Sequence, residues 1–451
     1  MKPGFHLALA LLPFALSALF ADSTNVTPMA LQLLGTNQLR VSWPVRSVVP
    51  APGLRIFAHY QLENSPDLKT WQPVGAPLEG TNHSSLDVVV PAETSSAYFR
   101  LRSNISLPNA ALRQAKLDNA DLRDADLLYA DLSRASLTNA DLRGANLFGI
   151  TGFGATLDNA DLREADLTAA DLRNASLGGA QLDGANFFAA RLGASVLDGA
   201  TLTCASLRFA ELAGASLFQT DLTDADLRGA SFSRADLGYA AFRGSTLDAM
   251  TTLPDKWRQV WHLVNEGRPG DVITNLDLTF ATLTGLTLTN CDFAGSDLSF
   301  TDFTDSDLRG ANFTKSNLRF VFWNGTQIDD ATTLSAKARL NWQIVNEPVA
   351  GRVLPNADLS SLLFAGVQLN GANLRGANFS QSTLFQTQFR NADLSNANLA
   401  NADLTQVDFT GANLTGANLS GATFDHTIMP NGSIRGPGIG GWSGFLDAPW
   451  K

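Results

Sequence analysis

The sequence contains few residues of the kinds that build catalytic or metal sites. Two cysteines among 451 residues cannot form a disulfide framework, and the five histidines form no zinc-ligand cluster or nucleophile triad at recognisable spacing. Only 17% of the residues are charged and 45% are hydrophobic, which excludes a disordered chain. The net charge of −11 argues against a protein that neutralises nucleic-acid phosphates. We therefore expect no enzyme, no cofactor, no metal and no direct nucleic-acid binding.

Long apolar runs are also absent, apart from one at the start of the sequence. It extends from Phe5 to Phe20, follows Lys2 and ends in small and polar residues, which predicts a signal peptide over residues 1–21 with cleavage after Ala21. The run is too short to span a bilayer stably, and no later run reaches transmembrane length. We expect an exported mature chain, periplasmic or extracellular, with no transmembrane segment.

Residues 25–103 differ in character from the rest of the chain. Alternating apolar runs separated by Pro and Gly clusters predict a small antiparallel β-sandwich. The string from Tyr60 through Trp71, together with the closing run at Tyr98, resembles the fibronectin-type-III-like modules of exported bacterial proteins. We expect Trp71 to lie in the core of this module rather than to serve as a platform for a ligand.

A five-residue repeat begins at residue 105. From Leu107 to Leu247, 25 of 29 successive fifth positions are Leu and three are Phe, and Gly152 is the exception. Ala stands two residues before this position in 24 of the 29 units. A period of five matches neither a helix nor an ordinary strand, so the chain must turn once in every unit.

These turns predict a square coil of four units. With the Leu and Ala positions facing inward, stacked coils pair their backbones about 4.8 Å apart, and only a small residue fits beside the central ones. The Asp that lies between the inward positions is expected to accept nearby backbone N–H groups, as at Asp121, Asp141 and Asp161. Gly or Asn ends many units and predicts a turn with positive φ, as at Asn119, Gly144 and Gly184.

The repeated Ala-Asp-Leu and Ala-Asn-Leu units, as at 120–127 and 412–419, resemble the pentapeptide-repeat family. The resemblance implies an all-β fold, a right-handed quadrilateral β-helix, in three tracts at 105–249, 276–330 and 357–430. If the 55 units stacked without a break, the rod would be about 65 Å long, but the sequence leaves the continuity of the stack open.

The two interruptions, 250–275 and 331–356, are similar to each other in sequence. Trp257, Val260, Trp261 and Val264 follow the spacing of one helical face, and Thr252 has the spacing of a capping box. We expect short helical inserts that cover a coil end or side, with a projecting recognition element as the alternative. A Gly-rich tail over 431–451, which contains Trp442 and Trp450, is expected to dock against the last coil.

Function is predicted less sharply than fold. Five outward apolar residues fall on one side of the first tract and form a candidate docking stripe: Leu128, Tyr129, Phe148, Phe188 and Phe209. The alternative is that the sandwich module covers these residues. The sequence indicates an exported, non-enzymatic scaffold for an unknown protein partner or cell-surface component, and leaves oligomerisation open. The alternatives are a DNA mimic that inhibits DNA gyrase, as some family members do, and carbohydrate-surface adhesion.

Overall fold

The computed structural model describes residues 107–347 and 351–436 in full, and seven strands between Ala30 and Ile105 through their backbone. From residue 107 onward the chain winds into coils whose residues form parallel bridges, as between Asp121 and Asp141. Bridges recur at every fifth residue and join positions twenty residues apart, so a coil has four sides of five residues. The predicted quadrilateral coil is confirmed.

The lumen is filled by the Leu and Ala positions. Leu162 and Ala165, for example, are both 0% exposed. At the one unit where the repeat fails, the large side chain occupies the small position and the central position has none: Ile150 stands two residues before Gly152. A Cβ atom on Gly152 would lie 2.7 Å from Cδ2 of Leu172. The lumen therefore stays closely packed without a central side chain at that unit.

The turn positions behave as predicted and accept more residue types than Gly and Asn. Positive φ occurs at Asn119, Gly144 and Gly184, and also at Tyr129 and Phe209. The aspartates cap the same turns, since the backbone N–H of Arg163 donates to Oδ1 of Asp161 at 3.3 Å and that of Arg143 to Oδ1 of Asp141 at 3.4 Å. A large side chain at the turn position points outward and is available for contacts.

The lumen of the second tract is partly polar. Ser296, Thr301 and Ser306 occupy the small inward position, and their hydroxyls donate to carbonyl oxygens of the preceding coil at 2.7, 2.8 and 2.6 Å. Trp323 fills a central position and is 1% exposed. Each hydroxyl meets a backbone acceptor, so these polar groups are buried without the penalty of an unpaired donor.

Helix α2 (Asp255–Glu266) separates the first tract from the second. Its buried face includes Trp257 and Val260, and Nε1 of Trp261 donates to the carbonyl oxygen of Ser245 at 3.1 Å. The capping-box prediction is wrong: Pro254 is the N-cap residue, and no side chain caps the helix. The hydroxyl of Thr252 instead donates to Ser231 at 3.0 Å, because Thr252 forms the last bridge of the first tract.

Helix α3 (Ala336–Asn346) repeats this arrangement between the second and third tracts. Nε1 of Trp342 donates to the carbonyl oxygen of Thr326 at 2.8 Å. The bridges resume at Val272 and Val353, one unit before the tracts expected to start at 276 and 357. Neither first unit has Ala at the small position, which is Asp271 in one and Arg352 in the other, and this hides both units in the sequence.

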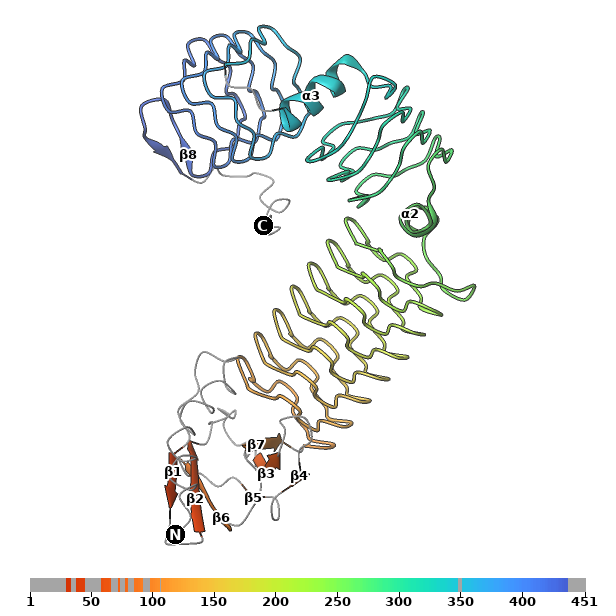
Figure 1. Ribbon diagram of the computed structural model, residues 1–451, viewed down its shortest axis with the longest axis vertical. Coiled ribbons are helices and arrows are strands. Elements are labelled where there is room, and N and C mark those ends of the chain that lie inside the picture. Colours follow the sequence, from red (N-terminus) through yellow and green to blue (C-terminus); the bar gives the residue numbers. More distant parts are fainter. Residues whose placement is uncertain are drawn as a thin grey trace, which may run out of the picture.

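Each helix acts as a wedge. Opposite α2, the two tracts touch directly, since the backbone N–H of Tyr239 donates to the carbonyl oxygen of Phe280 at 2.8 Å. A helix is about 10 Å wide whereas successive coils lie about 4.8 Å apart, so the tracts must tilt away from the helix. Tract 1 (107–252), tract 2 (272–333) and tract 3 (353–428) therefore follow a curve and form no continuous 65 Å rod (Figure 1).

The strands before residue 106 form two antiparallel sheets. One has the order β1 (Ala30–Leu33), β2 (Gln38–Pro44) and β6 (Ser85–Pro91). In the other, β3 (Ala58–Ser65) pairs with β4 (Gln72–Pro73), β5 (Leu78–Glu79) and β7 (Tyr98–Ile105). The side chains that would pack the sheets together, Trp71 included, lie outside the described residues, as does the signal peptide. The sandwich therefore stays a prediction.

A short hairpin of β8 (Thr427–Ile428) and β9 (Ile434–Arg435) closes tract 3. Within the described part of the chain, no helix is long and apolar enough to cross a membrane.

Candidate functional site: a cleft between the second and third tracts

One row of turn positions runs along the inner side of the curve, across both junctions. From the end of tract 1 onward its members all have positive φ, so their side chains point outward, and they include Tyr239, Phe280, Phe300, Phe320, Ser361, Gln381 and Asn401. The row is aromatic through the end of tract 2 and polar in tract 3. We call its first four residues the aromatic column.

The rings of the aromatic column lie against one another. Phe300 stacks on Phe280 with centroids 4.9 Å apart and on Phe320 at 4.8 Å, with interplanar angles of 2° and 11°. These separations match the coil spacing, so the backbone dictates the stack. Tyr239 meets Phe280 edge to face at 5.6 Å, across the junction. Because both faces of Phe300 are covered, the ring presents its edge to the outside.

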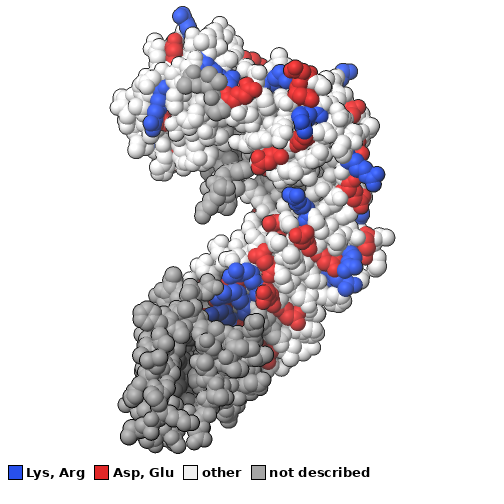
Figure 2. Space-filling view, in the orientation of Figure 1, with Lys and Arg blue, Asp and Glu red and all other residues white. Residues whose placement is uncertain are grey.

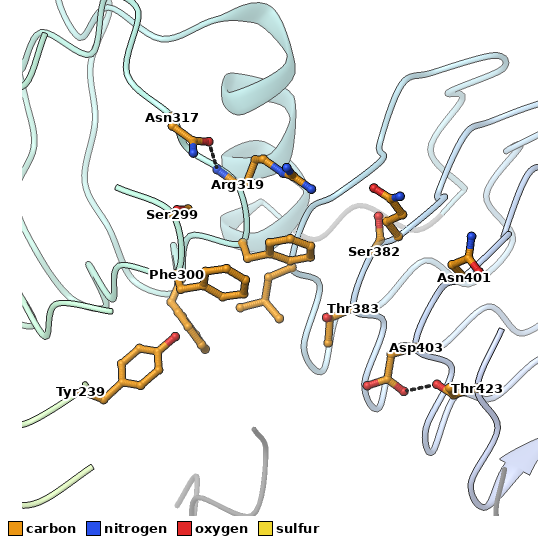
Figure 3. A pocket seen from close by; sticks show the side chains of 14 residues that line it. Tyr239, Ser299, Phe300, Asn317, Arg319, Ser382, Thr383, Asn401, Asp403 and Thr423 are labelled. Atoms are coloured by element: carbon orange, nitrogen blue, oxygen red, sulfur yellow. Dashed lines mark hydrogen bonds between the residues drawn. The ribbon is translucent and has the colours of Figure 1, made fainter. Parts of the chain in front are cut away.

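A cleft of about 490 Å³ opens beside this column. Figure 3 shows Phe300 and Arg319 of tract 2 on one side and Thr383, Asn401 and Asp403 of tract 3 on the other. The volume falls within the range of about 300–1,000 Å³ that is usual for ligand sites. The other lining residues are Tyr239, Ser299, Asn317, Phe320, Phe322, Leu363, Gln381, Ser382 and Thr423.

The two walls of the cleft differ in chemistry. Phe300, Phe320 and Leu363 provide an apolar floor, and Nη2 of Arg319 donates to the hydroxyl of Ser361 at 3.3 Å across the junction. Asp403 accepts a hydrogen bond from the hydroxyl of Thr423 at 3.2 Å. The cleft therefore offers apolar contact along one side and hydrogen-bonding groups along the other.

Tyr239 stands at the tract 1 end of the cleft. Its hydroxyl is buried and meets no hydrogen-bond partner among the described residues. Burial raises the pKa of Tyr239, and the neighbouring carboxylate of Asp302 raises it further. The phenol therefore stays protonated and keeps a donor available for an acceptor that enters the cleft.

The predicted stripe on tract 1 resolves into two aromatic pairs. Tyr129 meets Phe148 at 5.5 Å and Phe188 meets Phe209 at 5.7 Å, both edge to face. Leu128 is half-buried beside the first pair, while Tyr129, Phe188 and Phe209 are 53%, 39% and 39% exposed. The coil between the pairs carries Thr168, so the stripe is interrupted.

The stripe and the aromatic column lie on opposite sides of tract 1. Asn119 and Asn139 share the turn row of Tyr239, since whole coils of twenty residues separate them from it, and Tyr129 falls midway between those two. The sequence predicts the stripe but gives no sign of the cleft. Within tract 1, the row ending at Tyr239 carries no earlier aromatic residue, and the insert hides its continuation at Phe280.

Charges on the first tract alternate in sign. Arg143 bonds Asp141 at 2.8 Å and approaches Asp161 of the next coil to 3.4 Å, while Arg163 bonds Asp161 at 2.6 Å. Figure 2 shows positive and negative side chains interspersed along the outer edge of the curve. In the described ranges, no three His, Cys, Asp or Glu residues are grouped so that they could hold a metal ion.

The comparison with protein families gives a clear match. The family model of pentapeptide repeats matches residues 105–150, 153–188, 180–217, 210–248, 274–310, 353–391 and 387–425. No curated protein matches the sequence closely enough to count as a relative.

Several solved structures are similar to the chain. HetL, a pentapeptide repeat protein involved in heterocyst differentiation regulation in Nostoc sp. strain PCC 7120, is 24% identical over 66% of this chain and 91% of its own, with a TM-score of 0.23. QnrB1, a plasmid-mediated fluoroquinolone resistance protein, is 16% identical over 50% of this chain and 91% of its own, with a TM-score of 0.28. A pentapeptide repeat protein of the Arabidopsis thaliana thylakoid lumen is 31% identical over 27% and 75%, with a TM-score of 0.10.

Proposed function

The chain belongs to the pentapeptide-repeat family, and from this premise we propose that it is an exported, non-enzymatic scaffold that holds a segment of a partner protein in the cleft. The observation that carries the proposal is the aromatic column, whose ring edges border a cleft with a polar opposite wall. Aromatic and aliphatic side chains pack well against ring edges, and peptide groups need hydrogen-bonding partners. An extended segment with large apolar side chains satisfies both walls.

A carbohydrate fits this cleft less well. Ligands that stack on aromatic side chains need an open ring face, as unpaired bases do. Phe300 has both faces covered, and Phe320 has Phe300 on one face and the guanidinium of Arg319 5.7 Å from its centroid. We therefore favour a protein segment over a sugar chain.

The alternating charges also weigh against a DNA mimic. B-DNA carries one negative charge per about 1.7 Å along its axis, without positive charges between them. In tract 1, Arg123 bonds Asp121 at 2.7 Å and lies 3.4 Å from Asp141 of the next coil. A surface of this kind lacks the continuous negative field that a nucleic-acid-binding protein would recognise.

The cleft can be tested against the stripe in vivo. Proteins cross-linked to the full chain would be compared for the wild type, Phe300→Ser with Phe320→Ser, and the control Phe188→Ser with Phe209→Ser. Each double change removes two neighbouring outward rings. We expect the cross-linked partner to be lost in the cleft variant alone, with all three chains melting within a few degrees of one another. An identical set of cross-linked proteins from all three chains would refute the cleft as the docking site.

Export rests on the sequence, because residues 1–21 lie outside the described ranges. If the signal is cleaved after Ala21, the mature protein begins at Asp22. N-terminal sequencing of the protein recovered after cell fractionation tests this directly. An intact Met1 in the cytoplasmic fraction would overturn export while leaving the cleft proposal standing.

A further inference from the structure

The hairpin at the end of tract 3 sends the chain back toward the cleft. β9 pairs antiparallel with β8 in a register that sets Arg435 opposite Thr427, and the N–H of Met429 donates to the carbonyl oxygen of Ser433 at 2.8 Å. From Ile434 to Arg435 the chain therefore runs in the direction opposite to 427–428. That direction leads toward Thr423, the last coil residue that lines the cleft.

A second contact fixes the point where the chain leaves the hairpin. The guanidinium of Arg435 lies 3.7 Å from the centroid of the Phe424 ring, in the close geometry of a cation–π pair. Phe424 directly follows Thr423 in the chain. The chain therefore leaves the hairpin beside the tract 3 end of the cleft.

The length of the segment suffices to cross the cleft. Thr423, Asp403, Thr383 and Leu363 mark successive coils along the tract 3 side of the cleft, and the bridges link each to the next. Three coil spacings amount to about 14 Å. The fifteen residues 437–451 reach about 50 Å when extended, so less than half of them would be needed.

The composition of the segment matches the two walls. It carries five large apolar side chains, separated by Gly and Pro residues that disfavour a helix: Ile439, Trp442, Phe445, Leu446 and Trp450. Asp447 and Lys451 have charges opposite to those of Arg319 and Asp403 in the cleft.

We propose that residues 437–451 fold back into the cleft of their own chain and compete there with the partner segment. This inference rests on the proposed function of the cleft and adds its regulation. The indole and phenyl rings of the segment pack on the edges of Phe300 and Phe320. The hydroxyl of Tyr239 donates to a backbone carbonyl of the segment, which gives that buried donor a partner.

Competition of this kind weakens partner binding by a measurable factor. A short tether gives an effective concentration in the millimolar range. If the isolated segment bound with a Kd of roughly 100 μM, its occupancy would raise the apparent Kd of the partner about tenfold. Displacing the segment would restore the intrinsic affinity.

Photo-cross-linking within the full chain tests the contact. Gln381 would be replaced by p-benzoylphenylalanine, and irradiated monomer would be digested and analysed by mass spectrometry. We expect the peptide around position 381 joined to residues 437–451. The matched control carries the same photoreactive residue at Thr168, on the opposite side of tract 1. Cross-links to another region, equal yields at both positions, or links found only between two copies of the chain would each overturn the proposal.

A second variant distinguishes failure of the autoinhibition proposal from failure of the proposed function. Trp442→Ser with Phe445→Ser alters only the segment and should lower the cross-link at position 381 several-fold and tighten partner binding about tenfold. If position 381 fails to cross-link to the segment while the cleft change Phe300→Ser with Phe320→Ser still abolishes partner binding, autoinhibition is refuted and the proposed function stands. If the cross-link forms but the cleft change leaves the partner bound, the proposed function is refuted instead.

Discussion

The ring of Phe209 lies over the backbone of Gly229, one coil further along. A Cβ atom at Gly229 would come within 2.5 Å of Cδ1 of that ring. Tyr129 covers Gly149 in the same way, again at 2.5 Å. In each exposed pair of the stripe, one ring therefore leans along the tract axis over a residue that has no side chain.

This contact predicts a specific cost for Gly229→Ala. The new methyl group must displace the ring of Phe209, and alanine is also strained at the φ of +71°. Gly214→Ala is the matched control, because it has a φ of +69° and nothing within 4 Å. We expect both to lose about 1 kcal/mol in urea unfolding from the backbone strain, with a further loss of about 0.5–1.5 kcal/mol at Gly229. Equal losses would show that the ring contact contributes nothing.

The lumen predicts a larger effect for Ala165→Leu. Ala165 is 0% exposed, and three added carbons should cost about 1–3 kcal/mol or more in unfolding free energy. The outward change Thr168→Leu is the control, which loses only the hydroxyl contacts with Asp166 at 2.5 Å and Asn186 at 2.8 Å. We expect that control to cost about 0.5–1.5 kcal/mol at most. A control as damaging as Ala165→Leu would mean that inward and outward faces are assigned wrongly.

For the stripe, Phe148→Ser with Phe188→Ser breaks one ring contact in each pair. Both residues are outward, so melting should shift by a few degrees at most, while any self-association through the stripe falls. Sedimentation measures the association, and proteolysis near Asn104 reports whether the sandwich module covers the stripe instead. Unchanged sedimentation and proteolysis together would leave the stripe without a binding role.

Helix α3 buries a polar side chain at a position where α2 buries an apolar one. Asn341 is 0% exposed, and neither its amide oxygen nor its nitrogen meets a partner in the described residues. Val260 holds the equivalent place in α2 and is also 0% exposed. Asn341→Val should therefore stabilise the chain by about 1–3 kcal/mol, and the reciprocal Val260→Asn should destabilise it comparably. Loss of stability in Asn341→Val, measured by thermal unfolding, would indicate a partner for the amide.

Acid should weaken the repeat tracts through the Asp–Arg pairs. Arg173 donates to Asp171 at 2.6 Å, and this hydrogen bond lowers the pKa of Asp171 below its usual value. Arg309 lowers the pKa of Asp307 in the same way. A carboxyl group with a depressed pKa in the folded state contributes stability above its unfolded pKa of about 3.9 and loses it as pH falls through the folded value.

Urea unfolding between pH 7 and pH 2 checks this sign. Asp171→Asn should reduce the loss of unfolding free energy below about pH 4, whereas the exposed control Asp330→Asn should leave that loss unchanged. A decline of the same steepness in both variants would assign the acid sensitivity to other groups.

The sequence predicts the coil well because the lumen leaves a signature in every unit. A five-residue period requires a turn at each step, and the small and central positions follow from size alone. The helical inserts are also readable, since Trp257 and Val260 follow a helical period. Family membership is confirmed by the match to the family model.

The cleft could not be predicted, because it depends on how the tracts meet. Tyr239 and Phe280 fall in one row of turn positions only when the residues of the α2 insert are left out of the twenty-residue spacing. Nothing in the sequence indicates that this helix lies between two stacked coils. Thr252 illustrates the same limit: its spacing fits a helix cap, yet it continues the coil and bridges Ser231. The choice between the two depends on tertiary packing.

Tract 2 sets the separation between the bends at α2 and α3, and its length is a whole number of coils. Inserting or deleting twenty residues there would move the second bend by about 4.8 Å while leaving each wedge and its contacts in place. The distance between the two bends can therefore change only in steps of one coil. Repeat duplication therefore offers a route by which partners of different breadth could be accommodated without redesign of either wedge.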